Sequence, residues 1–299
     1  MGVGSEAIVL PARRFGSGAQ PLVLLHGFTG GGQAFEHLFA VGGGARGEVR
    51  GEGGGAAGLL GAEVNALCPD LPGHGQARAL AGDQALPEPF TATAAAVART
   101  AAKAFGGPVH LAGYSMGARL ALAVALEFPE LVRTLVLESG GAGLASPTAR
   151  EERRAADEVL AKVLDREGLR AFLARWEKTP VLGGLQLLPA PALESLRERR
   201  LQNEPHALAW ALRALGQGAQ PSYWHRLSEL RCPVLVVHGE RDEKFTALAD
   251  RLCAAIPDAR KETIAGAGHT PHLEQPQRYA AAVRRFLAQP ARKAAPSKT

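Results

Sequence analysis

The sequence VHLAGYSMGARLALA (residues 109–123) joins a short apolar run to a helix-forming segment through the turn GYSMG. A G-x-S-x-G turn between a strand and a helix is typical of a nucleophile elbow, in which side chains at the glycine positions would collide with neighbouring backbone. Alone, the five residues could also occur by chance in a glycine-rich chain. The strand before them and the helix after them favour the elbow, so we predict Ser115 as the reactive residue.

Apolar runs similar to residues 109–112 recur along the chain and alternate with helix-like segments. Each run is bounded by turn residues and is almost continuous in apolar side chains, as expected for strands buried on both faces. This alternation predicts an α/β fold with a mainly parallel sheet flanked by helices. The other predicted strands are Leu22–Leu25, Val64–Cys68, Leu135–Leu137 and Val234–Val237.

A helical, arginine-rich segment interrupts this alternation before the last strands. We predict a helical cap at 146–228, inserted over the carboxyl edge of the sheet, where open α/β sheets bind ligands. The α/β core is then formed by 1–145 and 229–288. The glycine-rich stretch 42–61 is expected to be a flexible loop, and 289–299 a disordered tail.

The bulk composition is that of an ordinary globular protein. Hydrophobic residues make up 46% and charged residues 21% of the 299 residues, which is enough apolar surface for one large core with an insertion. No run approaches the roughly 18 apolar residues that a membrane helix needs, and the amino-terminal residues lack the apolar region of a secretion signal. We therefore expect a cytoplasmic protein without a membrane span.

The charge and the cysteines exclude two further classes of site. The formal charge of +5 includes three basic residues of the acid-free tail, and the other basic residues are dispersed among acidic ones, so no nucleic-acid partner is expected. The cysteines form no C-x-x-C pair, which argues against a zinc site or a disulfide framework. We expect Cys68, Cys232 and Cys253 to pack in the core.

A reactive serine needs a base, and the base needs an orienting carboxylate. Asp242 follows a predicted strand in the sequence HGERD, and His269 closes the glycine loop AGAGH. We predict Asp242 and His269 as these two groups. The competing carboxylates are Glu240 and Glu243, which we interpret as solvated loop residues. His272 competes with His269 but lies beyond the turn, so we expect it at the surface or behind the site.

Reaction at a carbonyl also needs hydrogen-bond donors aimed at the developing oxyanion. The backbone N–H of Met116, directly after the serine, is one candidate donor. The N–H of Phe28, in the loop HGFTG after a predicted strand, is the other. We expect structural roles for His26 in this loop and for His74 in the turn DLPGHG.

The segments LLHGFTG, DLPGHG, GYSMGARLAL, HGERDEKF and GAGHTPHLEQP resemble the α/β-hydrolase superfamily over almost the whole chain. This resemblance implies the α/β-hydrolase fold and a triad of Ser115, Asp242 and His269, in the family's chain order of serine, acid and histidine. It does not fix the reaction, because many esterases and C–C hydrolases share these motifs.

A narrower resemblance is to the family of 2-succinyl-6-hydroxy-2,4-cyclohexadiene-1-carboxylate (SHCHC) synthases, the lyases of menaquinone biosynthesis. The chain matches that family's elbow motif GYSxGxR and its cap motifs R-x-x-x-D (with Asp157) and R-x-x-N (with Asn203). It departs from the family at Ala118, where a glycine is common, and in the longer glycine-rich insertion. The substrate-binding residues that the resemblance implies are Tyr114, Arg119, Arg153, Trp176 and Arg200.

The same resemblance implies the reaction. Pyruvate would be eliminated from 2-succinyl-5-enolpyruvyl-6-hydroxy-3-cyclohexene-1-carboxylate to give SHCHC, with Ser115, activated by His269, as the base. The substrate has three carboxylates, and planar guanidinium groups can pair with carboxylates bidentately. The implied partner is a small anionic molecule. We expect no cofactor and no metal, and a monomer is the expected state.

Two other functions fit the residues at this point. A serine hydrolase acting on a carboxylate-bearing ester or on a C–C bond would use the same three residues, and a binding protein with an inactive triad would use none of them chemically. For Arg119, Arg153 and Arg200 the alternative is surface salt bridging on helices. Release of pyruvate would separate the lyase from both other functions.

Overall fold

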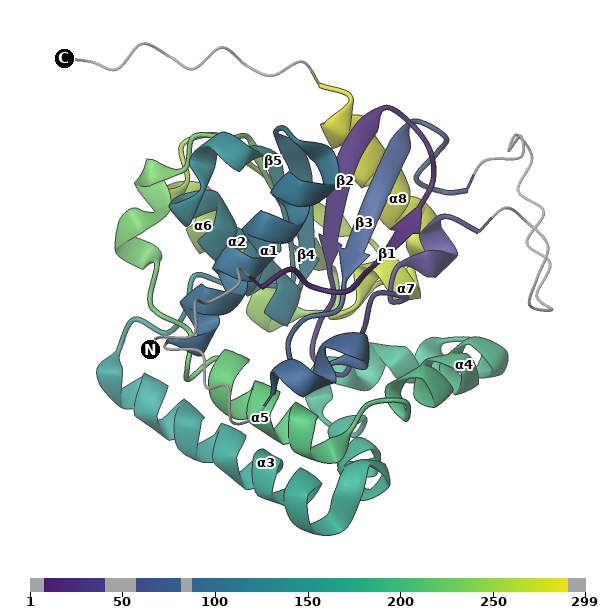
Figure 1. Cartoon of the computed structure of the whole chain (residues 1–299), viewed down its shortest axis with the longest axis vertical. Helices are drawn as coiled ribbons and strands as arrows, with labels where there is room; N and C mark the ends of the chain where they lie inside the picture. Colours follow the sequence, from purple (N-terminus) through teal and green to yellow (C-terminus); the bar gives the residue numbers. More distant parts are fainter. Residues whose placement is uncertain (1–7, 41–57, 82–87, 290–299) are drawn as a thin grey trace, which may run out of the picture.

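The structure, a computed structural model, describes residues 8–40, 58–81 and 88–289. The stretch predicted as a flexible glycine-rich loop lies outside these residues except for its last four, and the predicted tail lies outside them except for Gln289. Within the described residues, helices flank both faces of a central sheet (Figure 1).

Seven strands of the described residues form one sheet, in the order β1-β3-β2-β4-β5-β6-β7. The antiparallel edge strand β1 is mostly exposed and lacks an apolar run, which is why it is not among the predicted strands. All other neighbours are parallel, so the predicted fold class is confirmed. The strands are β1 (Ala12–Phe15), β2 (Gln20–Leu25), β3 (Val64–Pro69), β4 (Val109–Tyr114), β5 (Val132–Glu138), β6 (Val234–Gly239) and β7 (Ala259–Ile264).

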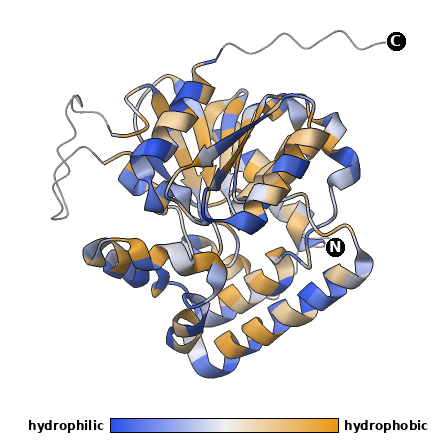
Figure 2. Cartoon of the chain, turned by 180° about the vertical axis from the view of Figure 1, so that it is seen from behind, coloured by the Kyte–Doolittle hydropathy of each residue, from blue (hydrophilic) through white to orange (hydrophobic). Residues whose placement is uncertain are grey.

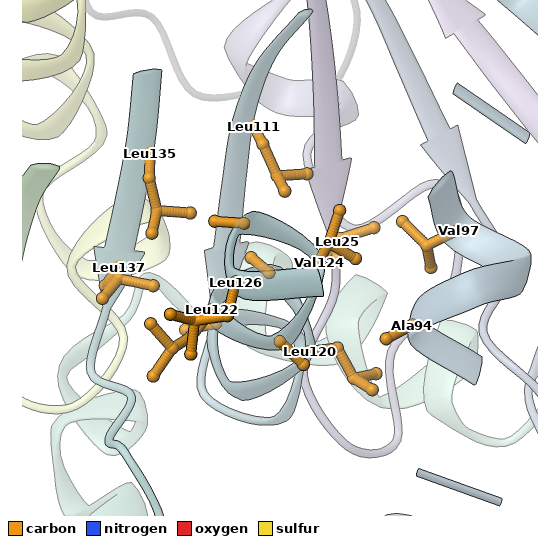
Figure 3. Close-up of a cluster of buried hydrophobic side chains, with 14 of the residues drawn as sticks. Leu25, Ala94, Val97, Leu111, Leu120, Leu122, Val124, Leu126, Leu135 and Leu137 are labelled. Carbon is orange, nitrogen blue, oxygen red and sulfur yellow. The ribbon is translucent and has the colours of Figure 1, made fainter. Parts of the chain in front are cut away.

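The side chains of the central strands alternate between two buried faces. On β2, Val23 and Leu25 belong to the cluster under α1, α2 and α6, and Figure 3 shows Leu25 within this cluster. Leu22 and Leu24 pack on the opposite face, against α8. The strands are therefore mostly orange in Figure 2, whereas the helices carry both colours. The covering helices are α1 (Pro89–Phe105), α2 (Met116–Glu127), α6 (Glu243–Ala255) and α8 (Pro276–Leu287).

A block of helices separates β5 from β6 and lies at one end of the sheet (Figure 1). We call residues 146–228, the predicted cap, the cap segment. Its helices α3 and α5 pack around Leu164, Phe172 and Leu208, each no more than 1% exposed. Its elements are α3 (Pro147–Trp176), which includes the non-helical Gly168, η4 (Pro180–Leu187), α4 (Ala190–Arg200), α5 (Pro205–Leu215) and η5 (Trp224–Glu229).

Short helical elements lie in the connections around the sheet. They are η1 (Glu36–Leu38), η2 (Gly75–Leu80), η3 (Pro129–Leu131) and α7 (Pro271–Glu274). The cysteines are unpaired and pack in or against the core, as predicted. In the described ranges, no helix is long and apolar enough to cross a bilayer, and no group of three or more potential ligands could hold a metal ion.

Gly117, at the start of α2, packs directly against strand β2. A Cβ added there would lie 2.1 Å from the carbonyl oxygen of Leu25, and this backbone cannot move without distorting the sheet. We predict that Gly117→Ala lowers the free energy of unfolding by about 1–3 kcal/mol or more, through overpacking.

The matched control is Gly107→Ala, because an added Cβ there would meet nothing within 4 Å. This variant should stay within about 0.5 kcal/mol of the wild type. Urea unfolding of both variants measures the difference, and equal stabilities would contradict the close approach of α2 to β2.

Candidate active site

Ser115 occupies the turn between β4 and α2 in a strained backbone conformation. Its φ and ψ are 51° and −105°, which few residues with a side chain adopt. A Cβ on Gly113 would lie 2.3 Å from the carbonyl oxygen of Gly117, so the turn requires glycine there. The N–H of Ser115 donates to the carbonyl of Glu138 at the end of β5, over 2.8 Å. The motif GYSMG therefore forms the elbow that the sequence predicts.

The structure brings the three predicted triad residues into one hydrogen-bonded chain. The His269 Nε2 lies 3.3 Å from the Ser115 Oγ, and its Nδ1 lies 2.8 Å from the Asp242 Oδ2. The other carboxylate oxygen of Asp242 accepts the N–H of Phe245 and caps α6. The Asp242 and His269 side chains are only 9% and 6% exposed, which strengthens their interaction. This arrangement can move a proton between the serine and the imidazole.

The competing carboxylates make no hydrogen bond to Ser115, His269 or Asp242 within the described residues. Glu240 is exposed and accepts the N–H of Gly266, and Glu243 is exposed at the start of α6. Both are solvated loop or helix-end residues, as predicted.

Aromatic rings enclose the imidazole of His269. The ring of Phe245 lies 4.7 Å from it and that of Tyr114 lies 5.6 Å from it, between centroids. The Tyr114 hydroxyl is 3.1 Å from the Thr270 Oγ1, and burial raises its pKa well above the usual value. Tyr114 therefore remains a neutral phenol beside the candidate site.

For His272 the structure separates the two alternatives, a surface location or a place behind the site. His272 is 2% exposed and its ring lies 4.8 Å from that of Tyr114, so it lies behind the site and not at the surface. Its backbone N–H and its Nδ1 both donate to the Glu138 Oε1, at 2.9 Å and 2.8 Å, and Glu138 is fully buried. The short helix α7 turns the chain back toward the end of β5, which sequence spacing does not reveal.

The two predicted oxyanion donors lie on either side of the elbow. The N–H of Met116 is the first of α2, and first-turn N–H groups have no partner inside a helix. Among the described residues, the N–H of Phe28 has no hydrogen-bond acceptor, whereas that of the next residue, Thr29, donates to the His74 Nε2. Their role as oxyanion donors stays a prediction.

His26 and His74 have the structural roles predicted for them. The His26 Nε2 accepts the N–H of Leu71 at 3.0 Å, and the His74 Nε2 accepts the N–H of Thr29 at 3.3 Å. The Nδ1 of each ring lies within hydrogen-bond distance of a backbone carbonyl oxygen. Burial lowers the pKa of both rings, that of His74 to about 3. The neutral rings thus tie together the loops after β2 and β3.

Arg119 is buried in the first turns of α2, with only 7% of its surface exposed. Its Nη1 donates to the carbonyl of Leu215 at 2.8 Å. In the described part of the chain, no carboxylate lies within ion-pair distance of it. Burial, followed by the nearby charge of Arg153, lowers its pKa to about 9. A buried cation without a counter-ion favours an anionic ligand, and a surface salt bridge is excluded for Arg119.

Arg153 belongs to the cap segment and is partly exposed. Its Nε donates to the Asp157 Oδ1 at 2.8 Å, and its Nη1 donates to the Gln217 Oε1 at 2.5 Å. The Asp157 side chain is 3% exposed. The charge of Asp157, which is paired with Arg153, offsets only part of the burial of Arg119, and the pKa of Arg119 stays lowered.

Arg200 is the last residue of α4, in the cap segment. Its side chain is 9% exposed and its Nη1 lies 3.3 Å from the Glu177 Oε1, while Arg197 binds the other oxygen of this carboxylate at 2.8 Å. Burial lowers the pKa of Arg200. Two cations thus share one carboxylate, and Arg200 lines a cavity of about 40 Å³ together with Phe28 and Tyr114.

Trp176 packs on the loop that carries the Phe28 N–H. Its ring stacks on Phe172 of the cap segment and meets the Phe28 ring edge-on, both at 5.7 Å between centroids. The predicted contact of Trp176 with substrate stays a prediction. The aromatic contacts couple the cap segment to the candidate oxyanion loop.

Asn203 is a residue to which sequence reasoning assigned no role. It is 7% exposed, its amide donates to the carbonyl of Thr29 at 3.1 Å, and its side-chain oxygen accepts the N–H of Gly75 at 3.1 Å. Its motif R-x-x-N marks it in the sequence. Its partners lie in two loops far away along the chain, so their identity could not be predicted.

Comparison with known proteins places these residues in a family context. The alpha/beta hydrolase family model matches residues 22–282. A 2-succinyl-6-hydroxy-2,4-cyclohexadiene-1-carboxylate synthase of Salmonella agona (strain SL483) is 33% identical over 260 residues, which cover 87% of this chain and 90% of that protein. A Bacillus subtilis (strain 168) protein provisionally named as the same synthase is 43% identical over 179 residues. This alignment covers 60% of the chain and spans only 65% of that protein's length.

The fold comparison agrees. The structure of MenH from S. aureus superposes with a TM-score of 0.80 at 30% sequence identity, covering 92% of this chain and 97% of that one.

We predict that His74 makes the protein less stable in acid. Its pKa is 6.5 in the unfolded chain and about 3 in the folded protein. Because the folded value is the lower one, the stability from the neutral ring is present above about pH 6.5 and is lost as the pH falls toward 3. His74→Gln cannot titrate, so its free energy of unfolding should fall less steeply over this range.

Urea unfolding at a series of pH values measures these slopes. Since His26, His37 and His110 also have lowered pKa values, the variant should retain part of the slope. The exposed His225→Gln serves as the control and should follow the wild type. If His74→Gln follows it as well, the neutral His74 is not a source of the acid sensitivity.

Proposed function

Because the chain belongs to the alpha/beta hydrolase family and, within it, to the family of the SHCHC synthases, we propose that it eliminates pyruvate from 2-succinyl-5-enolpyruvyl-6-hydroxy-3-cyclohexene-1-carboxylate. The product is SHCHC, and the pathway is menaquinone biosynthesis. The partner is this small anionic substrate, with no nucleic acid involved. A cytoplasmic location fits a biosynthetic enzyme of this kind.

The observation that carries the proposal is the buried guanidinium of Arg119, which has no ion-pair partner among the described residues. At Glu177, a second excess of positive charge arises because one carboxylate serves both Arg197 and Arg200. A neutral ester would leave these charges unbalanced, whereas the three carboxylates of the proposed substrate would neutralise them.

The proposed reaction removes one proton from the ring and shifts electrons across the ring toward the leaving enolpyruvyl oxygen. The Ser115 Oγ, hydrogen-bonded to His269, takes the proton from the ring carbon that bears the succinyl group, and the serine proton passes to the imidazole. The C–H electrons form a double bond, the ring double bond shifts, and the bond from carbon to the enolpyruvyl oxygen breaks. The 3-cyclohexene thus becomes a 2,4-cyclohexadiene. The enolpyruvyl group leaves as an enolate, which takes up one proton on carbon to become pyruvate and so balances the proton removed from the ring.

Charge that develops in this reaction must be stabilised at the succinyl carbonyl oxygen. The N–H groups of Phe28 and Met116 would donate to this oxygen, as oxyanion donors do in acyl transfer. Asp242 would stabilise the protonated imidazole and hold its orientation. No acyl-enzyme forms in this mechanism, and every step uses side chains or backbone of this chain alone.

The same triad could instead serve a hydrolase for a carboxylate-bearing ester or a C–C bond. In that reaction Ser115 or an activated water would attack a carbonyl, and no pyruvate would be released. A binding protein with an inactive triad is a weaker alternative, because the three residues are aligned for proton transfer.

We predict that Ser115→Ala and His269→Ala each lower the rate of pyruvate release by roughly 10²–10⁴-fold, the usual effect of a lost general base. Asp242→Asn should cause a large loss as well, since the orientation of His269 is lost. Coupled detection of pyruvate measures the rates, and thermal unfolding checks the fold. The exposed Ser228→Ala should keep the wild-type rate. Near-normal turnover by Ser115→Ala would show that the proposed base is wrong.

A further prediction concerns the arginines. Truncating one partner of a buried charge pair costs about 2–5 kcal/mol. At 1.4 kcal/mol per decade, Arg119→Ala and Arg200→Ala should each lower kcat/KM for the tricarboxylate by roughly 30- to 4,000-fold, and Arg153→Ala, which removes a partly exposed side chain, by a smaller factor. Lysine should restore only part of the activity, because it lacks the planar fork. Steady-state kinetics of pyruvate release measures these effects.

The control variant is Arg213→Ala, which removes a partly exposed cap-segment arginine already paired with Glu158 and Asp165. It should keep the wild-type kcat/KM. Slow hydrolysis of a small neutral ester should survive all four changes, since it needs only the triad and the oxyanion donors. If the three site variants process the tricarboxylate normally, a hydrolase should replace the lyase as the proposed function.

A further inference from the structure

We propose that Glu274 is a positioning residue that fixes the loop around His269, and that the cap segment acts on this loop through Gly184. The inference rests on the proposed function for its kinetic test, but its structural part does not depend on the substrate.

The carboxylate of Glu274 holds the backbone on both sides of His269. Its Oε2 accepts the N–H of Gly268 at 2.6 Å, and its Oε1 accepts the N–H of Thr270 at 3.0 Å. Glu274 makes no ion pair within the described residues, so these two N–H groups are what stabilises its charge. Hydrogen bonds to a charged acceptor are about twice as strong as neutral ones.

The loop before His269 needs such a restraint. It contains Gly266, at φ +74°, and Gly268, and glycine has more backbone freedom to lose than any other residue. The His269 ring itself is held by its contacts with Asp242, Ser115 and neighbouring rings. A shift of about 1 Å in a group of this kind can cost on the order of 100-fold in rate.

The cap segment reaches this carboxylate directly. Gly184 lies in η4, and a Cβ on it would be 2.2 Å from the Glu274 Oε2. The end of a glutamate side chain can usually move aside, but here both oxygens are engaged by Gly268 and Thr270. The backbone of η4 can therefore sit on the carboxylate only because residue 184 has no side chain.

These contacts form a path from the cap segment to the base of the reaction. When η4 is seated, its backbone covers the carboxylate and keeps water from competing for the two N–H groups. A side chain at residue 184 would either displace the carboxylate of Glu274 or lift η4. In both cases the loop around His269 would lose its restraint, although the triad residues themselves would be unchanged.

The test uses Gly184→Ala, with Gly183→Ala as its matched control. The neighbouring Gly183 is in the same element, and a Cβ there would meet nothing within 4 Å. Glu274→Gln is the second variant, because the amide keeps the size of the side chain but can accept only one of the two bonds well. The substrate-independent readout is the exchange broadening, in ¹H NMR, of the His269 imidazole N–H that faces Asp242.

We expect Gly184→Ala and Glu274→Gln to broaden this resonance and to lower kcat for pyruvate release by on the order of 10- to 100-fold, with KM little changed. Gly183→Ala should match the wild type in the resonance, in kcat and in KM. This split between kcat and KM is not expected of a residue that only supports the fold.

The other outcomes separate the two proposals. If the wild type shows the His269 resonance but releases no pyruvate, the proposed lyase function is wrong. The resonance in the variants then still decides the role of Glu274. Wild-type resonance and kcat in Glu274→Gln overturn the positioning role. Equal behaviour of Gly184→Ala and Gly183→Ala overturns the action of the cap segment. If Glu274→Gln does not fold, Glu274→Asp replaces it, because the shorter carboxylate cannot hold both N–H groups, and an unchanged resonance and kcat in that variant overturn the positioning role.

Discussion

The strained backbone at Ser115 is the constraint around which the candidate site is arranged. A residue with a side chain in such a conformation costs about 1–3 kcal/mol, so it persists only where the surrounding fold enforces it. Here β5 accepts the Ser115 N–H through Glu138, and α2 begins close against β2 at Gly117. Because three central strands hold the turn, the serine hydroxyl and the first N–H groups of α2 stay at the carboxyl edge of the sheet, where the other loops of the site converge.

The buried arginines Arg119 and Arg200 add an electrostatic cost to the conformational cost of the strained backbone at Ser115. Burial lowers the pKa of Arg119 and of Arg200, which means that the folded protein holds these cations in an unfavourable environment. A protein can retain such unfavourable buried cations when a bound anion offsets their cost. An anion that binds only the folded state stabilises that state. Under the proposed function, the charge of the site would suit a substrate with several carboxylates, whereas the triad alone is compatible with many reactions.

The sequence predicted what is local and missed what depends on distant contacts. GYSMG, HGERD and GAGH placed Ser115, Asp242 and His269 at the ends of strands, and the narrower family resemblance is confirmed by the relatives. The burial of His272 against Glu138, 134 residues away, could not be read from spacing. The bond from Asn203 to Thr29 spans 174 residues, and it forms only because the cap segment folds back over the loops after β2 and β3.

The cap segment contacts the site on both sides of the proposed reaction. On the oxyanion side, the Asn203 amide donates a hydrogen bond to Thr29, next to the Phe28 N–H. On the base side, η4 packs on the carboxylate of Glu274, which binds the backbone on both sides of His269. The arginines are divided in the same way, since Arg119 belongs to the core and the other two to the cap segment. A substrate with several carboxylates can therefore bridge the two parts. Its remote binding energy would then be used to align base and oxyanion donors, which raises kcat and not only affinity.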